Sequence, residues 1–150
     1  MKAIDLLKKQ HREIEKLFGE VLKSEDPRVR MSVASEIHAM LEVHMTIEEE
    51  TFYPAYRRAA KDTNADSLVL EAVEEHHVLD LLLEELPKIN ASGENFGARM
   101  KVLEELIAHH VEEEEIQMFP DAERRMGSRT LDRLGAEMEV RAAQLAISIP

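Results

Sequence analysis

One short motif occurs twice in the sequence, 66 residues apart, as His44-x-x-x-Glu48 and His110-x-x-x-Glu114. In each copy a second glutamate follows the first, and an aromatic residue and a proline come a few residues later. Residues four apart on an α-helix lie on one face, one turn from each other. Each copy therefore predicts a helix that presents an imidazole and a carboxylate side by side, as two ligands of one metal centre.

Four histidines also share an equal spacing of 33 residues, namely His11, His44, His77 and His110. Residues on adjacent antiparallel helices lie at the same height when the turn is midway between them. The three midpoints fall near Pro27, Lys61 and Gly93, where proline, polar residues and glycine independently predict turns. An up-down bundle would therefore place the four histidines in one layer.

The rest of the sequence favours the same architecture. Only five of the 150 residues are glycine and five are proline, and apolar residues recur at helical spacing through most of the chain. Helices are predicted at about 3–23, 27–60, 67–86, 94–125 and 129–147. We expect one all-α domain spanning 1–150, with an up-down-up-down four-helix bundle at about 3–126 and an additional C-terminal helix at about 129–147.

Charge and composition restrict the classes of partner. The formal net charge of −12 argues against nucleic acid and anionic membranes. The chain contains no cysteine, which excludes disulfides and iron–sulfur clusters. The N-terminus has no apolar signal region, and no apolar run is long enough to span a membrane. We expect a cytoplasmic monomer or homodimer.

Burial of the two motif glutamates would require a cation or strong hydrogen bonds, because an unpaired buried carboxylate costs several kcal/mol. Six residues are predicted to bind metal, namely His11, His44, Glu48, His77, His110 and Glu114. They are too many for one tetrahedral zinc ion. Mixed nitrogen and oxygen ligands suit iron, manganese or cobalt, and two ions bridged by the glutamates would use every group. Two Fe(II) ions and two carboxylates leave a net charge of +2, which would attract an oxo or hydroxo bridge.

This pattern of four histidines and two glutamates resembles the hemerythrin-like family, also called the HHE cation-binding domain. The resemblance covers about residues 3–126 and implies a left-handed up-down bundle around a non-haem di-iron site. It implies two iron ions as the cofactor, with manganese as an alternative. Members of the family bind dioxygen, sense oxygen or iron, or react with nitric oxide and peroxide.

The sequence departs from the oxygen-carrier pattern on the third helix. Carriers have two histidines one turn apart there, whereas His77 has Val73 four residues before it and Leu81 four after. We expect Glu74, Asp80 or solvent to complete the coordination of that iron. Carriers also end with His-x-x-x-x-Asp, one residue longer than the His110 motif here.

The positions of several other polar residues relative to the expected ligands predict their roles. His76 and His109 each precede an expected ligand by one residue and are predicted to be surface or outer groups. Glu49 and Glu115 either accept a hydrogen bond from a ligand imidazole or belong to a solvated acidic face. Tyr53 either packs around the site or lends its hydroxyl to a bound oxygen species.

Two functions remain in competition at this level. The first is a binding protein that stores, delivers or senses dioxygen or a related small oxidant. The second is a di-iron oxidoreductase acting on peroxide or nitric oxide. A ferritin-like ferroxidase needs Glu-x-x-His on two helices, and only Glu74-x-x-His77 occurs here. After this ferritin-like class, the fourth alternative is a bundle whose metal only stabilises the fold.

Overall fold

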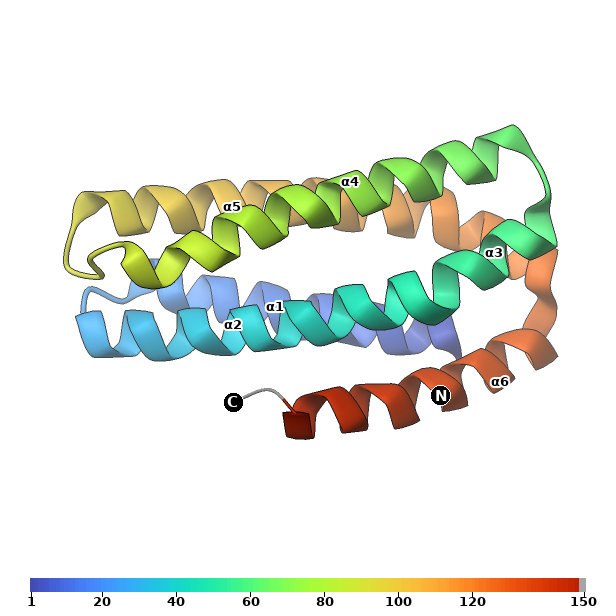
Figure 1. Cartoon of the computed structure of the whole chain (residues 1–150), viewed down its shortest axis with the longest axis horizontal. Helices are drawn as coiled ribbons and strands as arrows, with labels where there is room; N and C mark the ends of the chain where they lie inside the picture. The colour runs from blue at the N-terminus through green and yellow to red at the C-terminus, as the bar shows by residue number, and fades with distance from the viewer. Residues whose placement is uncertain (149–150) are drawn as a thin grey trace.

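The chain forms an up-down-up-down four-helix bundle with a further helix across its side, which confirms the predicted fold class (Figure 1). The computed structural model describes residues 1–148. The helical elements, in order, are α1 (Ala3–Lys23), α2 (Pro27–Ile47), η1 (Glu48–Phe52), α3 (Tyr53–Ala60), α4 (Thr63–Glu85), η2 (Leu86–Lys88), α5 (Glu94–Glu113), η3 (Glu114–Met118) and α6 (Phe119–Ser148). The second bundle helix runs through α2, η1 and α3, and the fourth runs through α5, η3 and the first part of α6.

The turns form where the sequence predicts them. The Asp26 side chain accepts a hydrogen bond from the amide of Arg28, and Pro27 occupies the first turn of α2. Asp62 caps α4 by accepting from the amide of Ala65 at 2.8 Å. Lys61 ends α3 in the left-handed region, with φ of 53°. These local signals fix the lengths of the antiparallel helices.

Both copies of the motif continue into a π-helical turn, η1 or η3, that begins at the motif glutamate. Proline follows each turn, as Pro54 and Pro120. A proline ring clashes with the carbonyl four residues earlier in a regular α-helix and cannot donate a hydrogen bond. The π turn, which contains one residue more than an α-helical turn, lets the helix continue past the proline.

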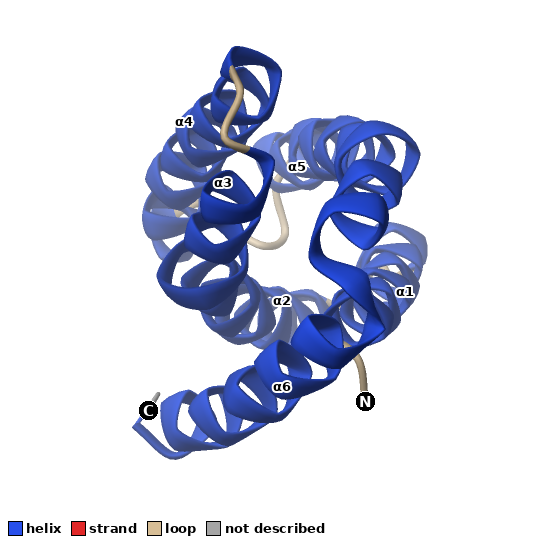
Figure 2. Ribbon diagram, turned by 90° about the vertical axis from the view of Figure 1, so that its right-hand side faces the viewer, coloured by secondary structure: helices blue, strands red, loops and turns tan. Residues whose placement is uncertain are grey.

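The last part of α6 leaves the bundle axis and crosses its side (Figure 2). The change of direction occurs at Gly127, where φ is 78° and ψ is 163°. Gly135 packs directly on the N-terminus, since a Cβ there would lie 1.9 Å from the carbonyl oxygen of Met1. Arg141 donates two hydrogen bonds to Glu50, at 2.7 and 3.0 Å, and so connects this segment to η1.

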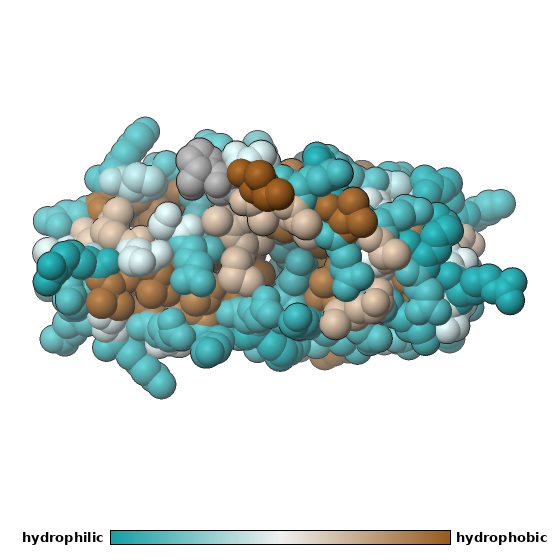
Figure 3. All heavy atoms as spheres, turned by 90° about the horizontal axis from the view of Figure 1, so that it is seen from below, coloured by the Kyte–Doolittle hydropathy of each residue, from teal (hydrophilic) through white to brown (hydrophobic). Residues whose placement is uncertain are grey.

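The interior consists of two hydrophobic clusters, one toward each end of the bundle. One includes Leu7, Phe52 and Phe119, and the other includes Ile14 and Leu103. Apolar side chains also gather on the face seen in Figure 3. Among residues 1–148, no helix is both long and apolar enough to cross a membrane.

Candidate metal centre

A layer of four buried histidines lies between the two hydrophobic clusters: His11, His44, His76 and His110, hereafter the histidine layer. Glu48 and Glu114 are buried beside it, with exposed fractions of 0% and 1%. The structure thus brings together five of the six residues predicted as ligands. The prediction that His77 is the sixth ligand is wrong. His77 lies on the exposed face of α4, and its neighbour His76 points inward.

The π turn after Glu48 explains this difference. Equal heights require equal numbers of residues on both sides of a turn only when both helices are regular. The extra residue in η1 means that the position level with His44 on α4 is one residue nearer the turn, at His76 rather than His77. In addition, the outer face of α4 carries apolar residues such as Leu70 and Leu81. The spacing of apolar residues therefore predicts the wrong face of α4 as the buried one.

The first group of potential ligands consists of His11, His44, Glu48 and Glu114, hereafter position A. His11 Nε2 lies 3.2 Å from Glu114 Oε1, and His44 Nε2 lies 3.3 Å from Glu48 Oε1. Two ligand atoms about 2.1 Å from one ion are about 3.0–3.4 Å apart at octahedral or tetrahedral angles. The spacing at position A therefore suits a single cation.

The second group consists of Glu48, His76 and His110, hereafter position B. His76 Nε2 lies 3.2 Å from Glu48 Oε1 and 3.2 Å from His110 Nε2. His110 Nε2 is also 3.3 Å from Glu114 Oε1. Glu48 belongs to both groups, and each glutamate has one oxygen close to ligands of both positions, so the geometry suits two adjacent ions that share carboxylates.

Several inward-pointing atoms have no hydrogen-bond partner among the described residues, namely His11 Nε2, His44 Nε2, both oxygens of Glu48 and Glu114 Oε1. A buried polar atom without a partner carries a desolvation cost of about 1–3 kcal/mol. These atoms converge on a common space instead of bonding to one another. That arrangement fits a resident cation, which would satisfy all of them at once.

The metal-free centre is a set of strongly coupled acids and bases. Burial raises the pKa of Glu48, and the adjacent Glu114 carboxylate raises it further. Burial also opposes ionisation of Glu114, but the neighbouring His110 holds its pKa well below the usual range. Burial opposes the charge on His76, whereas Glu48 and Glu49 raise its pKa to about 9. Because metal ligands bind in their proton-free form, a cation at this centre would displace protons from the groups whose pKa is raised.

The outer nitrogen of each imidazole in the histidine layer has a partner. Nδ1 of His11 donates to Glu115 at 2.7 Å, and Nδ1 of His76 donates to Glu49 at 2.9 Å. Of the two roles predicted for Glu49 and Glu115, these contacts favour acceptance of a hydrogen bond from an imidazole of the histidine layer. They also fix the tautomer, with Nε2 directed inward.

The other two partners were missed in the sequence. Nδ1 of His44 donates to Gln10 at 2.7 Å, and Nδ1 of His110 donates to Glu75 at 2.9 Å. A signal for them exists, because Gln10 and Glu75 each precede a histidine of the layer by one residue. It becomes readable only once His76 replaces His77 in the layer.

The tyrosine after the first motif enters the centre. Tyr53 is buried, its hydroxyl donates to Glu114 Oε2 at 2.8 Å, and the hydroxyl oxygen lies 3.3 Å from His76 Nε2. Neither Glu74 nor Asp80, the two carboxylates considered for the third helix, belongs to the ligand groups formed by the described residues. Glu74 is exposed, while Asp80 is half-buried beside Glu42, and burial raises its pKa to about 6.

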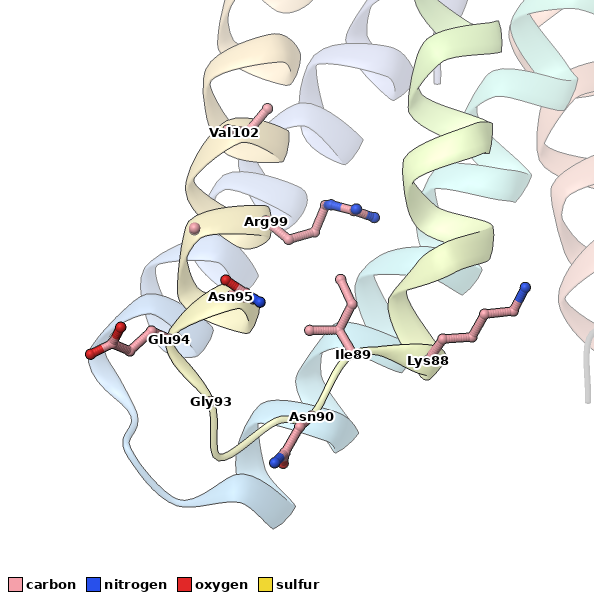
Figure 4. A pocket seen from close by; sticks show the side chains of 9 residues that line it. Lys88, Ile89, Asn90, Gly93, Glu94, Asn95, Arg99 and Val102 are labelled. Carbon is pink, nitrogen blue, oxygen red and sulfur yellow. The ribbon is translucent and has the colours of Figure 1, made fainter.

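A surface hollow of about 810 Å³ lies far from this centre, at the loop between η2 and α5 (Figure 4). Its lining includes Lys88, Asn90 and Arg99, and none of the residues of positions A and B. A smaller groove of about 450 Å³ runs between α1, α2 and the end of α6. Gln10 lines that groove and also accepts the hydrogen bond from His44.

Comparisons with known proteins find cation-binding domains of the same fold. A crystal structure of a hemerythrin HHE cation-binding domain-containing protein, the Rv2633c homologue of Mycobacterium kansasii, matches with a TM-score of 0.84 and 25% identity, covering 99% of this chain and 89% of that one. A DNA nickase from Nostoc sp. (strain PCC 7120 / SAG 25.82 / UTEX 2576) is 25% identical over 145 residues, which are 97% of this chain but only 40% of that protein. The family model for the hemerythrin HHE cation-binding domain matches residues 2–122. The chain therefore belongs to the hemerythrin HHE cation-binding domain family.

Proposed function

We propose that the protein holds two non-haem iron ions, one at position A and one at position B, and that this centre binds dioxygen or a related small oxidant. The observation that carries the proposal is the convergence of four imidazoles and two carboxylates on one buried space, with five of their atoms lacking any other partner among the described residues. The ligand set, nitrogen and oxygen without thiolate, suits iron, with manganese as the alternative.

The protein residues would have distinct roles. His11 and His44 would hold the ion at position A, His76 and His110 the ion at position B, and Glu48 and Glu114 would bridge them. Bound iron would supply reversible electron transfer and an open coordination position for the oxidant. The buried ring of Phe119 stacks on His11 and that of Phe52 packs against Phe119, and both would exclude bulk water.

Position B supports the oxidoreductase alternative. Carriers have a third imidazole at that position, whereas the Tyr53 hydroxyl approaches it here. Tyr53 would orient Glu114 through its 2.8 Å hydrogen bond. The Tyr53 hydroxyl would also be placed to donate its proton to a reacting oxidant. We therefore keep peroxide and nitric oxide beside dioxygen as candidate ligands.

A nucleic-acid substrate has less support. The similar DNA nickase is much longer than this chain, and the chain's net charge of −12 would repel a phosphate backbone.

One experiment tests the proposal. Protein loaded with iron is analysed for metal, reduced without oxygen, exposed to oxygen, and then purged with argon while its visible spectrum is recorded. A charge-transfer band that appears with oxygen and disappears on purging supports binding, whereas turnover of added peroxide or nitric oxide supports the enzyme. Protein that retains no stoichiometric iron or manganese would contradict the proposal.

A further inference from the structure

The two metal positions are related by the internal duplication, which makes their surroundings directly comparable. His11 of position A corresponds to His76 of position B, and His44 corresponds to His110. The outer partners correspond as well: Glu115 and Glu49 each follow a motif glutamate, and Gln10 and Glu75 each precede a histidine of the layer. Differences between equivalent residues therefore show how the two positions diverge.

The outer partners of position A include a single carboxylate. The amide oxygen of Gln10 accepts from His44, and the only carboxylate, Glu115, accepts from His11. Arg12 forms an ion pair with the same oxygen of Glu115 and a second with Glu15. The guanidinium, which Glu15 shares, thus offsets part of the negative charge of Glu115.

The outer partners of position B are both carboxylates. Glu49 accepts from His76 and Glu75 accepts from His110, each at 2.9 Å. Among the described residues, neither carboxylate forms an ion pair with lysine or arginine. Glu75 also lies within a surface group with Glu71, His109 and Glu113, which adds further negative charge on this side of the bundle.

These differences have one electrostatic consequence. A carboxylate that accepts from Nδ1 makes the imidazole a stronger donor through Nε2, and an uncompensated negative charge favours the more highly charged ion. Resting on the proposed di-metal function, we propose that the two positions differ in charge preference, so that position B holds the trivalent ion and position A the divalent one.

Redox-inert ions test this assignment directly. Metal-free protein is loaded with one equivalent each of Ga³⁺ and Zn²⁺ and crystallised, and anomalous diffraction is collected on both sides of each absorption edge. We expect the Ga³⁺-to-Zn²⁺ ratio at position B to exceed that at position A by about tenfold, equivalent to about 1.4 kcal/mol. Equal ratios, or Ga³⁺ enriched at position A, would overturn the assignment.

Variants show whether the outer partners cause the preference. Glu49→Gln combined with Glu75→Gln should reduce the enrichment of Ga³⁺ at position B over position A several-fold. Gln10→Glu combined with Arg12→Gln should also reduce it, because these changes add negative charge beside position A. Glu74→Gln, an exposed neighbour of Glu75 on α4, is the control and should leave it unchanged. An unchanged ratio in both double variants would refute the electrostatic cause.

Iron analysis separates this inference from the function on which it rests. Stoichiometric iron with evenly distributed Ga³⁺ and Zn²⁺ would reject the inference alone. Failure of the wild-type protein to bind iron or manganese at either position would reject the proposed function as well.

Discussion

The assignment of His76 rather than His77 to the centre is tested by substituting each with glutamine. The two residues are adjacent on α4, so their substitutions have the same effect on helix propensity. His76 is 1% exposed and faces Glu48, whereas His77 lies on the outer face. We expect the His77→Gln protein to retain two irons per chain and the His76→Gln protein to retain one.

The stability change follows from linkage. An ion present at about 100 times its dissociation constant stabilises the folded state by about 2.7 kcal/mol. For a chain of this size, about 2–4 °C of melting temperature corresponds to each kcal/mol. Loss of the ion at position B should therefore lower the melting temperature of the iron-loaded His76→Gln protein by roughly 5–11 °C relative to His77→Gln.

The assay combines metal analysis with calorimetry of the loaded and chelator-treated forms. The difference between the two forms isolates the contribution of the metal, because any packing defect caused by glutamine is present in both. The reasoning would fail if His77→Gln lost as much iron as His76→Gln, or if His76→Gln kept two irons per chain.

Three further substitutions address other contacts. Tyr53→Phe removes the donor to Glu114 and should lower the unfolding free energy of the metal-free protein by about 1–3 kcal/mol in denaturant titration, with iron content unchanged; an unaltered ferric spectrum would speak against a role at position B. Asp80→Asn should raise the melting temperature at pH 7 and much less at pH 4, because burial raises the pKa of Asp80 from 3.8 to about 6 and the resulting loss of stability grows between these two pH values and is complete only above about 6; an equal effect at pH 7 and pH 4 would contradict this. Gly135→Ala should cost about 1–3 kcal/mol because its Cβ would strike the Met1 carbonyl, whereas Gly97→Ala, with nothing within 4 Å, should be neutral or stabilising in the same titration.

The bundle could be predicted from the sequence because its signals are local. Asp26, Pro27 and Gly93 mark the turns, and helical spacing of apolar residues marks the segments between them. The equal spacing of histidines then sufficed to place His11, His44 and His110 at one height. Local signals of this kind do not depend on how neighbouring helices are rotated.

The remainder of the site depends on such rotation and on one irregularity. Because of the π turn at Glu48, the residue of α4 at the height of His44 is one position earlier than in a regular helix. The only sequence signal for this π turn is Pro54, which cannot follow a regular helix without strain. Gln10 and Glu75 contact ligands on adjacent helices. Periodicity within their own helices could not show which neighbour they face.

The two π turns also explain how one duplicated backbone supports two different environments. The extra residue allows consecutive side chains, Phe52 and Tyr53 in one copy, to be buried together. Tyr53 stacks on His76 with ring centroids 5.7 Å apart, and its counterpart Phe119 stacks on His11 at 5.9 Å. The packing is therefore the same at both positions, but only the tyrosine brings a hydroxyl to its histidine. Because a hydroxyl can bond to Glu114 and a phenyl ring cannot, the second difference between the halves again lies at position B, on the same side as the uncompensated carboxylates.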